Sequence, residues 1–146
     1  MMDSAGAQVF YEDVAIGDEI GPLSKKPTTV NLFRYSAVTW NAHRIHFDKD
    51  YALSEGHPDV LVQAHLHGAY LAQLVNDWVL PRGRILRFGW SNRGRAVPGD
   101  TLICTGKVVG KRVEDGQNLI ELDLREVNQH GNVCALGNAA VTLPGK

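Results

Sequence analysis

Five of the six histidines lie close together in the middle of the chain, namely His43, His46, His57, His65 and His67. In the segment 39–48, Asn41 and His46 are five residues apart, and the mixture of polar and apolar residues fits neither a helical nor a strand period. We therefore expect a loop from which both side chains reach the same small molecule or water. Because the ordinary pKa of histidine is about 6.5, His46 is suited to exchanging a proton with water near neutral pH.

A metal centre is the alternative explanation for the clustered histidines. H-x2-H and H-x-H spacings occur in zinc and iron sites. However, His65 and His67 are two apart on an expected helix, so they point to opposite sides and at most one of them faces a cleft. No cysteine lies near the cluster. We therefore predict no metal, and no role for His57, which precedes Pro58 in a connecting loop.

The longest helix is expected at residues 64–80, directly after the histidine-bearing loop. Apolar residues recur there every four positions in two neighbouring rows, and so wide an apolar face predicts a largely buried helix. Pro81 ends it. Shorter helices are expected at 30–39 and at 49–54, the second of them capped by Asp48.

Beyond residue 83 the apolar period changes to two, which is typical of strands. Strands are expected at residues 84–95, 101–113, 119–127 and 133–143, and residues 10–21 are expected to form a turn-rich opening. One long helix followed by antiparallel strands predicts an α+β fold in which a strongly curved sheet wraps around a central helix.

The composition of the 146 residues limits the classes of function to consider. The 15 basic and 16 acidic side chains leave a net charge of −1, so no overall field favours nucleic acid. No apolar run approaches the roughly 20 residues that span a bilayer, and no signal-peptide pattern opens the chain. Cys104 and Cys134 are far apart and lack metal-ligand spacing, which favours a reducing cytoplasmic location. We expect one domain over residues 1–146, with no nucleic-acid partner and no membrane insertion.

The segment that carries Asn41 and His46 resembles the active-site signature of the MaoC-like (R)-specific enoyl-CoA hydratases. That signature reads roughly S-G-D-x-N-P-I-H, followed by an acidic residue and an alanine. The residues on its positions are Thr39, Asn41, His43, Arg44, Ile45, His46, Asp48 and Ala52. The segment 62–66 is similar to the family's I-[AV]-H-G-[MP]-L, and the segment 98–102 to its P-G-D-x-L turn. The run T-W-N-x-H-R-I-H resembles a subgroup that carries Asn in place of the Asp.

The resemblance implies a hotdog fold, in which a curved antiparallel sheet holds one long helix, and a dimer with clefts at the subunit interface. It also implies a coenzyme A or carrier-protein thioester as the substrate, with no separate cofactor. In the family, the Asp and His positions activate the water that adds to C3 of a 2-enoyl thioester, and here these positions are Asn41 and His46. A backbone N–H at the start of the central helix polarises the thioester carbonyl, and Ala64 would supply it here.

Three departures from the family pattern bear on the expected chemistry. Asn41 cannot act as a base, so it can only orient water, and His46 is left as the one general base. Arg44 replaces a proline and adds a cation that could face a substrate carboxylate, a phosphate or solvent. Gln63 and Ala64 replace the usual His-Gly pair. The residues predicted to contact the substrate are His43, Arg44, Gln63 and His65.

Three functions remain open at this point. The first is an enoyl-CoA hydratase or 3-hydroxyacyl-thioester dehydratase that adds water reversibly to a 2-enoyl thioester as a homodimer. The second is a non-catalytic or half-catalytic hotdog subunit of a heteromeric dehydratase. The third is a hotdog thioesterase, which usually carries an acidic residue on the central helix, where this chain has only Asp77 at the far end.

Arginines that follow the central helix are candidates for binding the 3′-phosphate of coenzyme A. They are Arg82, Arg84, Arg87, Arg93 and Arg95. A solvated sheet face is an equal explanation for each of them. The sequence does not specify the acyl group.

Overall fold

The computed structural model describes residues 7–146. The helical elements are η1 (Tyr11–Asp13), α1 (Thr29–Thr39), η2 (Arg44–His46), α2 (Lys49–Ser54) and α3 (Ala64–Val79). The strands are β1 (Glu19–Lys25), β2 (Arg84–Asn92), β3 (Leu102–Glu114), β4 (Gln117–Val127) and β5 (Val133–Thr142). The helices expected at 30–39, 49–54 and 64–80 are confirmed to within one residue at each end.

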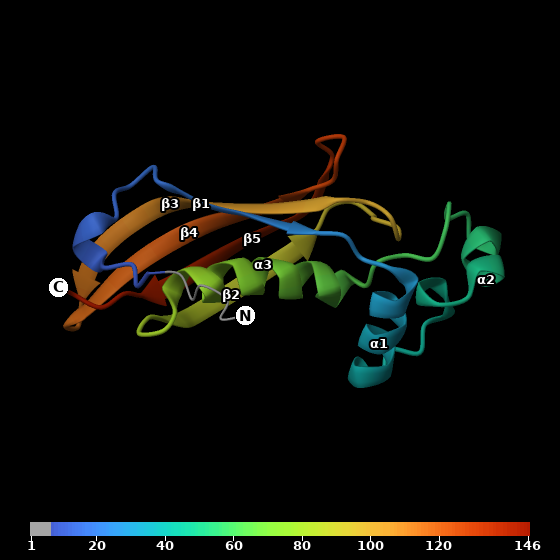
Figure 1. Ribbon diagram of the computed structural model, residues 1–146, viewed down its shortest axis with the longest axis horizontal. Coiled ribbons are helices and arrows are strands. Elements are labelled where there is room, and N and C mark those ends of the chain that lie inside the picture. The colour runs from blue at the N-terminus through green and yellow to red at the C-terminus, as the bar shows by residue number, and fades with distance from the viewer. Residues whose placement is uncertain (1–6) are drawn as a thin grey trace.

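The five strands form one antiparallel sheet in the order β1-β3-β4-β5-β2. The sheet curves around α3, which lies along its inner side (Figure 1). A tight turn at Asp115 and Gly116, both with positive φ, joins β3 to β4. This arrangement confirms the α+β fold with a curved sheet around a central helix.

The main apolar core lies between α3 and the middle strands. Leu71, Val75 and Val79 of α3 have no exposed surface, and they pack in one cluster with Ile120 and Leu122 of β4. The opposite side of α3 is exposed within the single chain. The expectation of a largely buried helix is therefore corrected: α3 is buried along one face, because the sheet covers only that side.

Strand β1 is the strand that the sequence did not predict, because residues 10–21 were expected to form a turn-rich opening and no element was expected at residues 22–27. It pairs antiparallel with β3 at one edge of the sheet, with an irregular register beside Gly21. Gly21 has a φ of 96°, and a Cβ at this position would lie 2.9 Å from the carbonyl oxygen of Cys104. Gly21 and Pro22 interrupt the strand's alternating pattern, which explains why periodicity missed it.

Strand β2 ends earlier than expected, at Asn92 instead of residue 95. The N–H groups of Arg93 and Gly94 both donate to the carbonyl oxygen of Cys134, at 2.8 and 3.1 Å. A Cβ at Gly94 would lie 2.7 Å from the carbonyl oxygen of Val133. A side chain at position 94 would therefore disturb the backbone where the chain leaves the sheet.

Helices α1 and α2 lie outside the sheet, beyond the N-terminal end of α3 (Figure 1). We call residues 28–63, which contain both helices, the overhang. Thr28 caps α1 through reciprocal hydrogen bonds with Asn31, and Asp48 caps α2 as predicted. A second apolar cluster holds the overhang against α3 and the sheet, and consists of Leu32, Ala52, Val60, Val62, Leu66, Ala96, Leu102 and Cys134.

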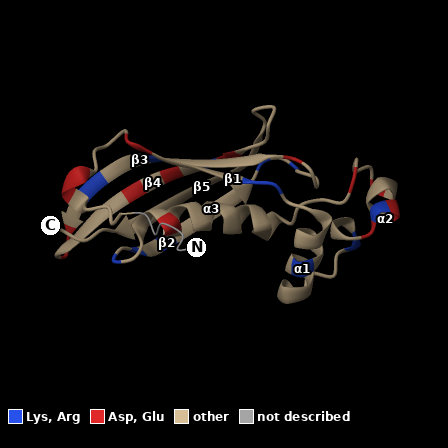
Figure 2. Ribbon diagram, in the orientation of Figure 1, with Lys and Arg blue, Asp and Glu red and all other residues tan. Residues whose placement is uncertain are grey.

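Charged residues of both signs are interspersed over the sheet and α2, whereas α3 is almost free of them (Figure 2). Asp77 is the one carboxylate on α3, and it lies near the C-terminal end of that helix. The N-terminal half of α3 therefore lacks the carboxylate that a hotdog thioesterase would use. Among the described helices, none is long and apolar enough to cross a membrane.

Candidate active site

The overhang holds the imidazole of His46 in a fixed orientation. This side chain is 7% exposed, and its Nδ1 lies 2.8 Å from the carbonyl oxygen of Leu61. A carbonyl only accepts hydrogen bonds, so Nδ1 donates and Nε2 of the neutral ring keeps its lone pair. Burial lowers the pKa of His46 below its ordinary value of 6.5, although the hydrogen bond to Leu61 opposes this shift. Nε2 is therefore suited to act as a base near neutral pH.

Asn41 lies at the turn between α1 and η2. Trp40 ends α1 in the left-handed conformation, with a φ of 54°, and the N–H of Asn41 donates to the carbonyl oxygen of Ser36 at 3.0 Å. The Oδ1 of Asn41 accepts a hydrogen bond from the N–H of His43 at 3.2 Å. This turn uses one lone pair of the amide oxygen, and the second lone pair is left for a water or a ligand.

Asn41, His46 and Ala64 line one cavity of about 470 Å³. The sequence predicted these three residues to be catalytic, and they come from the overhang and from the first position of α3. His43 of the overhang and His67 of α3 contribute further polar groups to the wall. The structure therefore brings the predicted catalytic residues together, and their catalytic roles stay predictions.

The N-terminal end of α3 reaches this cavity at Ala64. The N–H groups of a first helical turn have no partner inside the helix and carry partial positive charge, and Gln63 provides no side-chain cap. Trp90 of β2 holds this end in place, because its Nε1 donates to the carbonyl oxygen of Ala64 at 3.2 Å. Gly68 makes room for the indole, since a Cβ at this position would collide with the ring of Trp90.

Arg44 and His65 lie outside the lining of this cavity, although the sequence predicted substrate contacts for both. Arg44 forms an ion pair with Asp48, with Nη2 and Oδ2 2.6 Å apart, and its guanidinium lies over the ring of Tyr51. His65 is exposed and packs edge-on against the ring of Trp90. The cation of Arg44 thus already has a partner within the protein.

Gln63, a third residue predicted to contact the substrate, is completely buried. Its Nε2 donates to the carbonyl oxygen of Leu32 at 2.7 Å and to Oγ of Ser36 at 2.9 Å, which fastens α1 to the start of α3. Its Oε1 has no partner within residues 7–146. Of the four residues predicted to contact the substrate, His43 alone lines the cavity.

His67 was given no role by the sequence, yet it lies on the cavity wall. It is 1% exposed, and its Nδ1 is hydrogen-bonded to Oε1 of Glu126 on β4, which is completely buried. Glu126 continues, at period two, the buried row of β4 that contains Leu122 and Leu124. The one sequence signal for this contact was therefore a carboxylate in an otherwise apolar row of β4.

The five clustered histidines do not converge on one point. His43, His46 and His67 line the cavity, whereas His57 and His65 lie elsewhere. Within residues 7–146, no group of three or more His, Cys, Asp or Glu side chains is close enough to share a metal ion.

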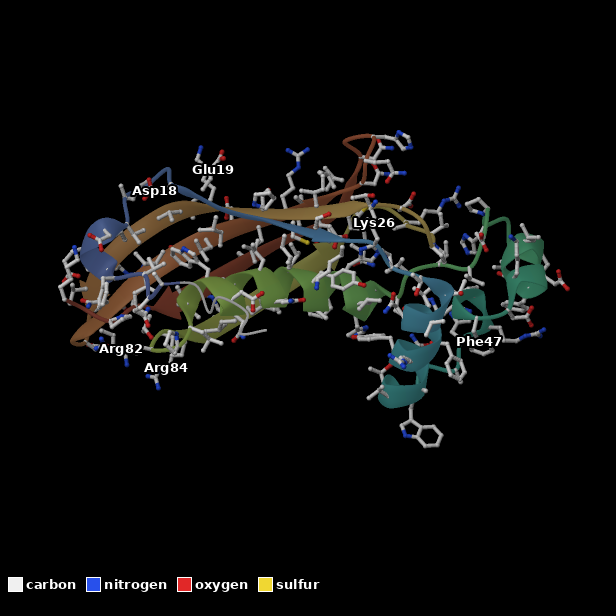
Figure 3. The ribbon with its side chains drawn as sticks, viewed as in Figure 1. Asp18, Glu19, Lys26, Phe47, Arg82 and Arg84 are labelled. Carbon is white, nitrogen blue, oxygen red and sulfur yellow. The ribbon has the colours of Figure 1, made fainter. Side chains whose placement is uncertain are left out.

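Arg93 and Arg95 bring positive charge to the cavity wall. In the part of the chain that the structure describes, neither forms a salt bridge. Arg82 and Arg84 lie at the opposite end of the molecule from Phe47 of the overhang (Figure 3). Among the arginines considered for anion binding, the pair at 93 and 95 is therefore the one at this site.

Two further hollows on the overhang adjoin the cavity. One, of about 440 Å³, includes His46, and the other, of about 400 Å³, includes Asn41 and Trp40. Phe33 and Phe47 line both of them. Asn41 and His46 therefore lie between a wall that carries arginines and a mostly apolar surface.

The model of the hydroxyacyl-thioester dehydratase type 2 family matches residues 18–95, which is more than half of the chain. The chain belongs to this family. The matched residues include the overhang and the start of α3, and therefore Asn41, His46 and Ala64. Membership confirms the resemblance to MaoC-like dehydratases, which are hydro-lyases, while the Asn subgroup stays a prediction.

Solved structures show that this dehydratase-family chain has the hotdog fold. The (R)-hydratase PhaJ1 from Pseudomonas aeruginosa matches with a TM-score of 0.86 and 19% identity, over 95% of this chain and 88% of that one. A MaoC-like dehydratase from Rhodospirillum rubrum matches with a TM-score of 0.82 and 17% identity, over 94% and 98%. A chain of the ChsH1-ChsH2 complex from Mycobacterium tuberculosis matches with a TM-score of 0.78 and 21% identity, over 88% and 98%.

One curated relative shares a short segment with this family member. A mesaconyl-C(4)-CoA hydratase from Chloroflexus aurantiacus is 50% identical over 44 residues. The match covers 30% of this chain and 16% of the relative. The two proteins are thus alike in sequence over a small part of the relative's length.

Proposed function

We propose that this member of the dehydratase family catalyses the reversible hydration of a 2-enoyl thioester carried by coenzyme A or by a carrier protein. The observation that carries the proposal is the single cavity shared by Asn41, His46 and the first residue of α3. Together these groups would supply a base, an amide oxygen that orients water and a backbone donor around one space.

Each group has a distinct task in the addition of water. Nε2 of His46 accepts a proton from the water as the water oxygen bonds to C3. The free lone pair of Asn41 Oδ1 holds the other hydrogen of that water. Negative charge develops on the thioester carbonyl oxygen, where the N–H of Ala64 stabilises it. Protonation of C2 completes the 3-hydroxyacyl thioester, and dehydration follows the same steps in reverse.

The surroundings of the cavity support a long substrate with an anionic part and an apolar part. Arg93 and Arg95 would meet the phosphates of coenzyme A or of a carrier's phosphopantetheine. The hollows beside Phe33 and Phe47 would take the acyl chain. To contact a substrate carboxylate or phosphate, Arg44 would first have to leave its ion pair with Asp48.

The proposal also concerns the cofactors and the cellular location of the protein. Hydration moves only water and protons, so the reaction needs no redox cofactor and no metal. Cys104 and Cys134 are free and buried, which supports the reducing cytoplasmic location expected from the sequence.

A second candidate is a subunit of a heteromeric dehydratase. The observation that favours it is Asn41, because an amide does not titrate and a partner chain could supply the carboxylate that this position lacks. Among the described residues, β2 pairs only with β5. Its free edge and the exposed side of α3 are therefore available to a second hotdog chain, either identical or different.

The first candidate is tested by assaying the purified protein with crotonyl-CoA and longer 2-enoyl-CoA esters, following loss of the conjugated enoyl absorbance. We expect hydration by the wild type and a fall of about 10²-fold to 10⁴-fold in kcat in His46→Gln. His130→Gln is the matched control, because His130 is exposed in the turn between β4 and β5. Full activity in His46→Gln would overturn the mechanism.

The oligomeric state of the active protein distinguishes the hydratase from the subunit of a heteromeric dehydratase. An active homodimer, measured by light scattering during size-exclusion chromatography, supports the hydratase. A protein that is inactive alone and becomes active when a hotdog chain encoded beside it is added supports the heteromeric subunit.

A further inference from the structure

A buried histidine–carboxylate pair borders the cavity and has no task in the reaction described above. His67 of α3 is 1% exposed and Glu126 of β4 is completely buried. Nδ1 of His67 is hydrogen-bonded to Oε1 of Glu126, and Oε2 of the same carboxylate lies 3.6 Å from Sγ of Cys104. The pair therefore joins the central helix to the sheet inside the core.

Burying such a pair in an apolar core costs free energy. A carboxylate loses its hydration on burial, and apolar residues of similar size would avoid that loss. The rest of this row on β4, including Leu122 and Leu124, is apolar. The one carboxylate in the row meets the one α3 histidine that lines the cavity. Buried titratable partners at the wall of a cleft are typical of functional sites.

The hydrogen bond to Glu126 determines which nitrogen of His67 can serve the cavity. Nδ1 is occupied, so Nε2 is left. Nε2 is therefore the ring nitrogen of His67 that can exchange a proton with the cavity. His46 is oriented in the same way, because its Nδ1 donates to the carbonyl oxygen of Leu61 and its Nε2 is left. The cavity is therefore bordered by two imidazoles that are each oriented through Nδ1.

His43 also lines this cavity but lacks an orienting partner for its ring. Its ring meets those of His46 and Tyr51 edge-on, with ring centres 5.8 and 6.3 Å apart, and the residue is exposed. No carboxylate within residues 7–146 is hydrogen-bonded to it. Because Asn41 cannot carry a proton, His67 is the better placed second proton carrier.

We propose that His67, oriented by Glu126, delivers the proton to C2 in hydration and removes it in dehydration. This assignment rests on the proposed hydratase function. In hydration, the water oxygen bonds to C3, His46 takes the water proton, and the electrons of the C2–C3 double bond move to the carbonyl oxygen as an enolate. The enolate then collapses as the Nε2–H bond of His67 breaks and the C2–H bond forms. A proton returns from His46 to His67 through water, which restores both rings.

His67→Asn tests this assignment. The Nδ2 of asparagine takes the place of Nδ1 and keeps the hydrogen bond to Glu126, but nothing replaces Nε2. We expect kcat to fall about 10²-fold or more with KM little changed. In the dehydration of a 3-hydroxyacyl-CoA deuterated at C2, we also expect a larger primary isotope effect. A purely structural pair would lower the melting temperature and leave the isotope effect unchanged.

Glu126→Gln is the second variant, and it keeps an oxygen acceptor for Nδ1 while removing the charge. We expect a fall of about tenfold in kcat and the same increase in the isotope effect, with His130→Asn as an unaffected control. Wild-type kcat and isotope effect in both variants would overturn the assignment and leave the role of His46 intact. A wild-type protein without hydratase activity would overturn the proposed function, and this assignment with it.

Discussion

Nδ1 of His46 donates a hydrogen bond to the carbonyl oxygen of Leu61, 2.8 Å away and 15 residues further along the chain. The N–H of Leu61 in turn donates to the carbonyl oxygen of Ile45 at 2.8 Å. These two hydrogen bonds fasten η2 to the segment that leads into α3. The orientation of the proposed base is therefore set by main-chain groups and does not depend on a second titratable side chain.

The pH dependence of activity should reflect the burial of His46. Because burial lowers the pKa of His46, Nε2 stays able to accept a proton below pH 6.5. We expect the acidic limb of kcat/KM, measured against pH with an enoyl-CoA substrate, to have its midpoint below the ordinary 6.5. A midpoint above that value would contradict the buried environment.

The same shift links folding stability to pH. The folded pKa of His46 lies below the unfolded value of 6.5, so the unfolded chain binds more protons between the two. The contribution of His46 to the free energy of unfolding is therefore complete above 6.5 and is lost as the pH falls through the folded pKa. In urea titrations from neutral pH to about pH 5, the wild type should lose more stability than His46→Gln. Equal losses would show that His46 titrates alike in both states.

Asn41→Asp should move the pH profile in the opposite direction. Aspartate keeps an oxygen for the N–H of His43, so the turn after α1 should survive. A carboxylate in the same cavity favours protonation of His46 and raises its pKa. We expect the acidic limb of kcat/KM to shift to higher pH in Asn41→Asp, and Asn41→Ala to lower kcat without that shift. An unmoved limb in Asn41→Asp would show that the two side chains do not share a cavity.

Replacing both arginines of the cavity wall should weaken substrate binding. We expect Arg93→Ala combined with Arg95→Ala to raise KM for crotonyl-CoA about tenfold with kcat little changed. For the crotonyl thioester of N-acetylcysteamine, which lacks the phosphates, the KM of this double variant should equal that of the wild type. Arg125→Ala on β4 is the matched control, because this arginine is exposed and lies outside the cavity lining. An equal increase in KM for both thioesters would contradict a phosphate contact.

Gly68→Ala should disturb the start of α3. The new Cβ would collide with the indole of Trp90, and the displaced ring would lose its hydrogen bond to Ala64. Overpacking costs about 1–3 kcal/mol, whereas alanine favours a helix over glycine by only about 1 kcal/mol. We therefore expect a net loss in the free energy of unfolding, measured with urea, together with a lower kcat. Gly89→Ala is the control, because a Cβ there has nothing within 4 Å. A Gly68→Ala protein at least as stable as the wild type would show that the indole moves freely.

Local signals predicted most of the elements, because the forces that form them act between near neighbours in the chain. The cap at Asp48 marked α2, and the alternation of Ile120, Leu122 and Leu124 marked β4. Strand β1 was missed because its Gly21-Pro22 step hides the alternation, and its stability comes from pairing with β3 far along the chain.

The candidate site was predictable only in part. Asn41 and His46 were found by their types and spacing and Ala64 by likeness to a family pattern, and the structure gives all three a common cavity. The contact of His67 with Glu126 joins residues 59 apart in sequence, which no local period reveals. The ion pair of Arg44 with Asp48 could have been predicted from the sequence, since this carboxylate follows the arginine four residues later.

The buried apolar residues form two clusters, one between α3 and the sheet and one that anchors the overhang. Phe33 and Phe47, which line the hollows proposed for the acyl chain, are 64% and 49% exposed and belong to neither buried set. Substitutions at these two positions would therefore reshape the space for a substrate at little cost to either cluster. Such a division allows homologous proteins to diverge in acyl preference during evolution while they keep one architecture.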